Sequence, residues 1–100
     1  MRYDRVYIAG KITGDANYYA KFHAAQDQLQ LEYGWNYWSI VNPVEMVPQG
    51  WPWWRQMVRC LRLVAGCEVV AMLPDWTQSR GARIEHEWAE SLGKEIIYLY

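Results

Sequence analysis

Four short runs of apolar residues divide the chain, and each predicts a buried β-strand. The first lies within Arg2–Gly10, where Val6–Ala9 is apolar throughout and Gly10 predicts a tight turn. The other three are expected at Trp38–Val41, Glu68–Leu73 and Glu95–Tyr100. Proline or asparagine directly follows the second and third runs and ends them. Because the third run is apolar after its first residue, it predicts a strand that is covered on both faces.

Apolar positions at helical spacing predict a helix after the first strand. This helix is expected to begin after an N-cap at Asp15 and to end at Gly34, the residue after its last turn. Its apolar side is formed by Tyr18, Phe22, Ala25 and Leu29. The later stretch Pro43–Pro52 contains three prolines and one glycine, so it predicts a loop.

Two further helices are predicted by the same spacing. One is expected from about Pro52, a favourable residue for a first helical position, to Ala65-Gly66. Its apolar stripe is formed by Met57, Cys60, Leu61 and Val64. The other is expected from Ser79 to Leu92, with Gly93 after it, and its inward positions are Ile84, Trp88 and Leu92.

Strands and helices thus alternate along one domain over residues 1–100. This order predicts an α/β fold of three layers, with a four-stranded parallel sheet of flavodoxin- or Rossmann-like type and helices on both faces. In such sheets ligands bind beyond the carboxyl ends of the strands, where the strand order reverses. The segments expected at that edge are Gly10–Gly14, Asn42–Met46 and Pro74–Gly81.

Composition excludes several classes of protein. The net charge is −1 and the basic residues form no stripe, which argues against a nucleic-acid partner. No apolar run has the length of a membrane span, and the N-terminus has no signal-peptide pattern, so the cytoplasm is the expected compartment. Two cysteines without a CxxC motif, and two histidines, predict neither a metal site nor a disulfide framework, and no cofactor is expected. Seven tryptophans and eight tyrosines exceed what a small core can hold, which predicts aromatic side chains in a pocket or a subunit interface.

The segment Gly10–Gly14 is the first candidate for ligand binding. Gly10, Lys11, Thr13 and Gly14 follow a buried strand, where backbone N–H groups can meet a phosphate or a ribose. The segment matches neither the Walker A pattern nor GxGxxG. An ordinary turn between strand and helix would have a similar sequence.

The segment Asp75–Glu85 is the second candidate. Ser79 or Thr77 can cap the following helix, and Gly81 lets a ligand approach its first N–H groups. Glu85 lies early in this helix, where the helix dipole favours the ionised carboxylate that a nucleophile requires. Trp76 lies in the preceding loop, where its ring could stack on a base. The alternative is that Glu85 is an ordinary surface glutamate at a favourable helix position.

Two motifs together resemble a known group of proteins. Tyr7–Gly14 (YIAGKITG) and Leu73–Glu85 (LPDWTQSRGARIE) are similar to a phage and bacterial family related to nucleoside 2-deoxyribosyltransferases and deoxynucleoside 5′-monophosphate N-glycosidases. Val41-Asn42-Pro43 and Ala89–Lys94 fit the resemblance, which covers nearly the whole chain. Its most specific part is Gly81–Glu85, because the related enzymes place a nucleophilic glutamate at this spacing after a glycine.

The resemblance implies a catalytic role for Glu85. Its carboxylate would attack the anomeric carbon of a 2-deoxyribose and expel the base, and water or a second base would resolve the glycosyl ester. It further implies Tyr7 near the nucleophile and Asn42 at the substrate. The relatives use an aspartate from the helix before the third strand, and this sequence has Cys60 there. Asp75 is the candidate to replace that carboxylate.

Three functions remain open from the sequence. The first is a deoxyribosyltransferase or N-glycosidase for a nucleoside or nucleotide. The second is a nucleotide-binding module that lost catalysis with the carboxylate at Cys60. The third is a phage-encoded interaction protein whose Trp51–Trp54 segment binds a partner. Since relatives often complete the site from a neighbouring subunit, a homo-oligomer is expected, with Gly50–Trp54 at the contact.

Overall fold

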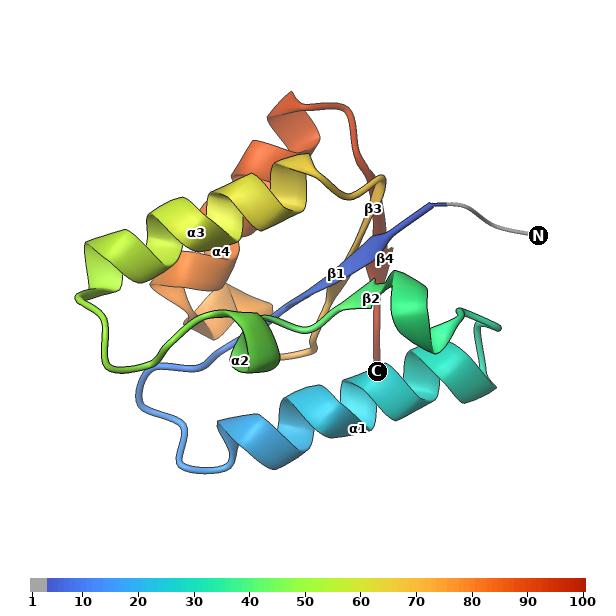
Figure 1. The fold of residues 1–100 in the computed structure, drawn as a ribbon, viewed down its shortest axis with the longest axis horizontal. Helices are drawn as coiled ribbons and strands as arrows, with labels where there is room; N and C mark the ends of the chain where they lie inside the picture. Colours follow the sequence, from blue (N-terminus) through green and yellow to red (C-terminus); the bar gives the residue numbers. More distant parts are fainter. Residues whose placement is uncertain (1–3) are drawn as a thin grey trace.

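A computed structural model describes residues 4–100 and contains one four-stranded sheet (Figure 1). The strands are β1 (Val6–Ala9), β2 (Ile40–Val41), β3 (Val69–Met72) and β4 (Glu95–Tyr98). All pairs are parallel, and the order across the sheet is β2-β1-β3-β4. The predicted all-parallel sheet is therefore confirmed, although the part of the first predicted strand before Asp4 lies outside the described residues.

Helices cover both faces of this sheet, which confirms the three-layer α/β architecture. Helix α1 (Tyr18–Leu31) covers one face, whereas α3 (Trp53–Ala65) and α4 (Arg80–Ser91) lie together on the other (Figure 1). Three shorter elements complete the fold, namely α2 (Pro43–Met46) and the 3₁₀ helices η1 (Tyr37–Ser39) and η2 (Trp76–Gln78). From β1 the chain passes through α1 to β2, on one side of β1, and from β2 it passes through α3 to β3, on the other side. The strand order therefore reverses between β1 and β3. This boundary is the switch point at which open parallel sheets bind ligands.

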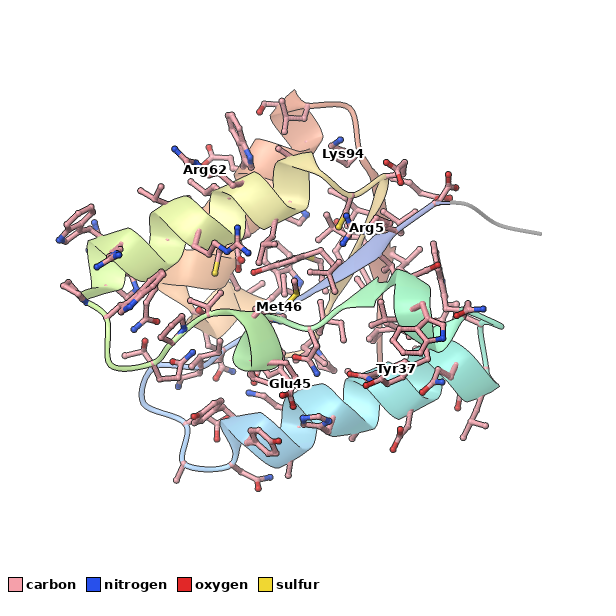
Figure 2. All side chains as sticks on the ribbon, viewed as in Figure 1. Arg5, Tyr37, Glu45, Met46, Arg62 and Lys94 are labelled. Atoms are coloured by element: carbon pink, nitrogen blue, oxygen red, sulfur yellow. The ribbon has the colours of Figure 1, made fainter. Side chains whose placement is uncertain are left out.

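The two central strands are buried along their whole length. Val6–Ala9 and Val69–Met72 pair in register from Val6 with Val69 to Ala9 with Met72. Side chains fill the space between the sheet and both helix layers (Figure 2). On the outside, Glu45 of α2 accepts hydrogen bonds from the Tyr19 hydroxyl at 3.0 Å and pairs with His23 at 2.6 Å, so α2 is held to α1 (Figure 2).

The predicted inward face of α4 is wrong. Trp88 and Leu92, expected inside, are 38% and 41% exposed, and the buried positions are Ala82, Glu85 and Ala89. The small alanines let α4 lie close to the sheet, and this rotates the larger side chains toward the rim. Trp88 still contacts α3, because its indole N–H donates to the Leu61 carbonyl at 3.0 Å.

Three local predictions also need correction. Helix α1 begins at Tyr18, later than an N-cap at Asp15 predicts, because Asp15 accepts instead from the Asn17 N–H at 2.8 Å and pairs with Lys21. The expected loop after Asn42 begins with α2, whose Val44 N–H donates to the Asn42 side chain. The first half of the predicted second strand, Trp38-Ser39, belongs to the 3₁₀ turn η1, so β2 has only two residues.

Candidate functional site

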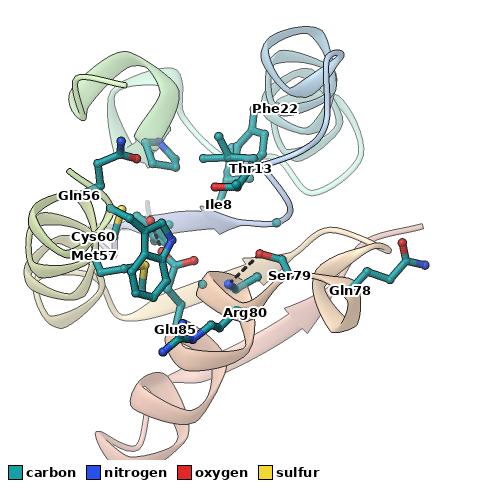
Figure 3. Close-up of a pocket in the computed structure, with 17 residues that line it drawn as sticks. Ile8, Thr13, Phe22, Gln56, Met57, Cys60, Gln78, Ser79, Arg80 and Glu85 are labelled. Atoms are coloured by element: carbon teal, nitrogen blue, oxygen red, sulfur yellow. Dashed lines mark hydrogen bonds between the residues drawn. The ribbon is translucent and has the colours of Figure 1, made fainter. Parts of the chain in front are cut away.

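A cavity of about 380 Å³ opens at the carboxyl end of β1, between the helix layers (Figure 3). Residues from β1, the loop after it, α1, α2, α3 and the start of α4 line it. Its larger apolar side chains are Ile8, Ile12, Phe22, Pro43, Trp53 and Met57. Its polar and ionisable side chains are Tyr7, Thr13, Gln56, Cys60, Gln78, Ser79, Arg80 and Glu85. The cavity therefore lies at the expected edge of the sheet, and the volume is that of a small-molecule site.

Glu85 provides the carboxylate of this cavity. It lies in the second turn of α4, is 5% exposed and faces the sheet together with Ala82 and Ala89. The Tyr7 hydroxyl, from β1, donates a hydrogen bond to Glu85 Oε2, and the Cys60 thiol, from α3, also bonds to the carboxylate. Three elements thus converge on one acidic group. The sequence-based alternative of a solvated surface glutamate is excluded.

Burial decides the ionisation of these three groups. It raises the pKa of Glu85 from 4.5 to about 7, against the opposing effect of the hydrogen bonds from Tyr7 and Cys60. Burial and the neighbouring carboxylate raise the pKa of Cys60 to about 12 and hold the pKa of Tyr7 well above its usual value. Near neutral pH, Tyr7 and Cys60 are therefore uncharged hydrogen-bond donors. Glu85 is the member of the group that changes charge in this range.

The first turn of α4 forms one wall of the cavity. The Ser79 hydroxyl accepts from the Ala82 N–H at 3.1 Å, so Ser79, and not Thr77, caps the helix. A side chain at Gly81 would place its Cβ 3.2 Å from Met57 Sδ, so glycine there permits α3 and α4 to approach closely. The Arg80 guanidinium lies over the Trp53 ring, 4.9 Å from its centroid. This wall therefore combines capped N–H groups with one cation.

The structure brings six of the eleven predicted site residues to the cavity. They are Tyr7, Gly10, Thr13, Ser79, Gly81 and Glu85. For Gly10 the structure also gives a packing reason, because a Cβ there would lie 2.4 Å from Leu73 Cδ1. The other five, Lys11, Gly14, Asn42, Asp75 and Trp76, do not line this cavity.

Asp75 lies away from the expected position beside Glu85. One carboxylate oxygen accepts from the Lys11 N–H at 3.1 Å, and the other pairs with the Lys21 ammonium. Lys21 pairs also with Asp15 and donates to the Lys11 carbonyl at 2.8 Å. This group, which we call the Lys21 cluster (Lys11, Asp15, Lys21 and Asp75), joins the loop after β1 to the loop after β3. Asp75 thus stabilises the rim of the cavity from outside.

The remaining predicted residues have local partners. Asn42 caps α2 and donates to Gln26 at 3.0 Å. The Trp76 ring stacks on His86 with centroids 4.2 Å apart. Gly14 adopts a positive φ of 80°, which glycine tolerates best, and lines a second, more open hollow beside the cavity.

The residues predicted for the site did not include Gln56, Met57 or Arg80, and Trp53 was expected at an interface. A signal was present on α3, where Trp53, Gln56, Met57 and Cys60 recur at helical spacing. Their position beside three tryptophans suggested an interface instead of a cavity wall. Cys60 itself, 8% exposed, belongs both to the apolar core and to the cavity wall.

Within residues 4–100, no group of three or more His, Cys, Asp or Glu side chains is arranged to hold a metal ion. Nor does any helix of this part of the chain combine the length and the apolar character that crossing a bilayer requires.

Comparison with known proteins places the chain in a family. Neither a curated protein nor a solved structure matches it. The family described as domain of unknown function (DUF4406) matches residues 4–98, which include every element of the sheet and the whole cavity. The chain therefore belongs to the DUF4406 family.

Proposed function

We propose that this protein cleaves the N-glycosidic bond of a nucleoside or nucleotide, as a hydrolase or a 2-deoxyribosyltransferase, with Glu85 as the nucleophile. The observation that carries the proposal is the buried Glu85 carboxylate on the cavity wall, oriented by a hydrogen bond from Tyr7. A buried carboxylate with a raised pKa in a cavity is a feature of catalytic sites more than of structural ones. The resemblance of Tyr7–Gly14 and Leu73–Glu85 to deoxyribosyl-transferring enzymes supplies the reaction class.

In the proposed reaction, Tyr7 holds Oε2 and Glu85 Oε1 attacks the anomeric carbon. The bond from that carbon to the base nitrogen breaks, the electron pair leaves with the base, and a glycosyl ester of Glu85 forms. Water then attacks the same carbon, the ester bond breaks with its electrons returning to the carboxylate, and one proton is released. In transfer, a second base takes the place of water. Both halves therefore use the ionised form of Glu85 as nucleophile or leaving group.

The leaving base must receive a proton from outside the described cavity. Among its lining residues as the structure describes them, Glu85 is the only carboxylate. A thiol with a pKa of about 12 is a weak proton donor at neutral pH, so Cys60 does not replace the aspartate of the relatives. We expect slow turnover, with water or a residue of a second subunit as the acid. The exposure of Trp54, at 65%, beside the cavity residue Trp53 agrees with a homo-oligomer contact there.

Cavity chemistry favours a nucleotide over a nucleic acid chain. Apolar walls suit a base and sugar, and Arg80, the one cation among the described lining residues, suits a 5′-phosphate at the start of α4. The chain as a whole has a net charge of −1, which disfavours a polyanionic partner. We place this activity in the cytoplasm, with no cofactor.

The test is base release from a panel of deoxynucleosides and their 5′-monophosphates, followed by chromatography. We expect Glu85→Gln to lower the rate of base release by at least about 10³-fold, because the amide is not a nucleophile. Glu87→Gln, an exposed neighbour on α4, is the matched control and should retain the parent rate. Equal rates in parent and Glu85→Gln would overturn the assignment of Glu85.

The pH dependence tests the same role in a second way. A nucleophilic Glu85 must be ionised, so the rate should rise with pH up to about 7 and stay level above it. A rate that falls above pH 7 would instead identify Glu85 as a proton donor.

A nucleotide-binding module without catalysis is the second candidate. The observation that favours it is Cys60 at the position where the relatives have a carboxylate. Calorimetric binding of deoxynucleoside monophosphates, with no base released after long incubation, would support this function. Absence of both binding and release would favour the interaction protein, with the exposed Trp54 in its contact surface.

A further inference from the structure

Gln56 is a polar residue of the cavity with a fixed orientation. It lies on α3, half-buried, and its side chain borders both the cavity and the second hollow. Figure 3 shows it reaching the cavity from the α3 side, away from Thr13 on the loop after β1. It is therefore placed to contact a molecule bound in the cavity that Glu85 also lines.

The hydrogen bonds of the Gln56 amide determine which of its atoms can meet a ligand. Nε2 donates to the Gln49 carbonyl at 3.1 Å and to the Trp51 carbonyl at 2.8 Å, so both amide hydrogens are used by the turn before α3. The opposite orientation would put the amide oxygen against two carbonyl oxygens, which repel it. The amide therefore presents its oxygen, an acceptor that cannot donate.

The surroundings make this oxygen selective. The cavity wall includes the apolar Pro43 of α2, Met57, which follows Gln56 on α3, and Ile12, which lines both hollows together with Gln56, whereas the cation Arg80 belongs to the start of α4. A flat ring against this wall gains from burial, and a donor on its edge gains a hydrogen bond to Gln56. A ring with a carbonyl at that edge would instead place oxygen against oxygen.

We propose that Gln56 is a specificity-determining residue that selects a base carrying an exocyclic amino group, an inference that rests on the proposed nucleotide substrate. The amino N–H donates to Gln56 Oε1 while the sugar lies over Glu85. The substrate class is thus an amino-bearing deoxynucleotide. The turn at Gln49–Trp51 keeps the acceptor in place before the substrate arrives.

Binding of two compounds that differ by one group tests the proposal. The probes are 2′-deoxyadenosine 5′-monophosphate and 2′-deoxynebularine 5′-monophosphate, which lacks the 6-amino group, and calorimetry gives the Kd of each. We expect the amino compound to bind about tenfold more tightly, the value of one hydrogen bond. Gln56→Leu should reduce this ratio to about one, since it removes the acceptor. Gln30→Leu, on α1 and not among the residues that line the cavity, is the matched control and should keep the ratio.

Each outcome bears separately on this proposal and on the proposed function. If the Kd values of the two compounds for the parent protein differ by less than twofold, the role of Gln56 is overturned even if base is released. This outcome does not depend on whether any variant folds. A tenfold ratio without base release supports Gln56 but contradicts catalysis. A preference that persists in Gln56→Leu assigns selectivity to another group and overturns the proposal, and no binding of either compound overturns both.

Discussion

Strand β1 turns Val6 and Ile8 toward α1, and Tyr7 and Ala9 toward α3 and α4. On the α1 side these residues meet apolar side chains such as Phe22 and Leu29. On the other side Tyr7 meets Cys60 of α3 and Glu85 of α4. One face of a single sheet is therefore an ordinary apolar core, whereas the other contains three buried ionisable groups beside the cavity. Burial stabilises the fold on the first face and sets the pKa of a carboxylate on the second.

Removing apolar volume on the α1 face should give the largest loss of stability. We expect Leu29→Ala, at a fully buried position, to lower the unfolding free energy by about 3 kcal/mol. Leu31→Ala, two residues away and exposed, should change it little. Urea denaturation measures both. A Leu29→Ala protein as stable as the parent would contradict the division between the two faces.

Adding a charge on the other face should lower the free energy of unfolding somewhat less, and this loss of stability should depend on pH. In Cys60→Asp two carboxyl groups would share one buried site, so at pH 8 we expect a loss of about 2–3 kcal/mol. Below about pH 6 one of them keeps a proton and the loss shrinks. If the new carboxylate also assists the leaving base, release should increase by 10²-fold or more.

Cys60→Asn, similar in size but neutral, is the control for this substitution. It should show neither the pH-dependent loss nor the gain in base release. A Cys60→Asp protein that is fully stable at pH 8 and no more active than the parent would contradict both roles of Cys60, in the core and in the site.

Removing the buried charge should raise the free energy of unfolding instead of lowering it. Between pH 4.5 and about 7 the folded protein holds a proton on Glu85 that the unfolded chain has lost, so stability falls as pH rises across this range and is level above it. Glu85→Gln removes this dependence and should be about 2 kcal/mol more stable than the parent at pH 8. Melting curves at pH 5 and pH 8 measure the difference, and a destabilised variant at pH 8 would refute the cost assigned to the carboxylate.

The Lys21 cluster should give the smallest effect on stability, because it lies at the rim outside both cores. Lys21→Met leaves Asp15 and Asp75 without their shared cation, and we expect Tm to fall by roughly 5 °C. Amide exchange at Lys11 should accelerate as its bond to Asp75 weakens. Unchanged exchange there would show that the two loops hold together without the ammonium.

The order of elements and the edge that carries the cavity follow from the sequence, because strand and helix periodicities are local and parallel connections have one hand. The side-chain environment of Glu85, by contrast, does not follow from the sequence pattern. Its burial depends on the rotation of α4 about its axis, which Ala82 and Ala89 determine against the larger Trp88 and Leu92. A hydrophobic pattern gives most weight to large side chains and therefore predicted the wrong face.

Asp75 illustrates the second limit of sequence reasoning. Its motif places it near the site along the chain, but its partner Lys21 comes from α1, more than fifty residues earlier. An ion pair between distant segments has no local signature. Gln56 was missed for a related reason, since its orientation depends on two backbone carbonyls of the preceding turn.

The position of β1 at the centre of the sheet has a consequence for the growing chain on the ribosome. Val6 of β1 pairs with Val69 of β3, so one edge of β1 stays uncovered until β3 has been synthesised. Helix α1 can form early, but its apolar side has no complete sheet to cover until β3 has emerged. Folding therefore depends on pairings between distant parts of the chain, which form slowly. Until then the segment that contains Tyr7 is apolar and unpaired, and such segments are sites of aggregation during folding.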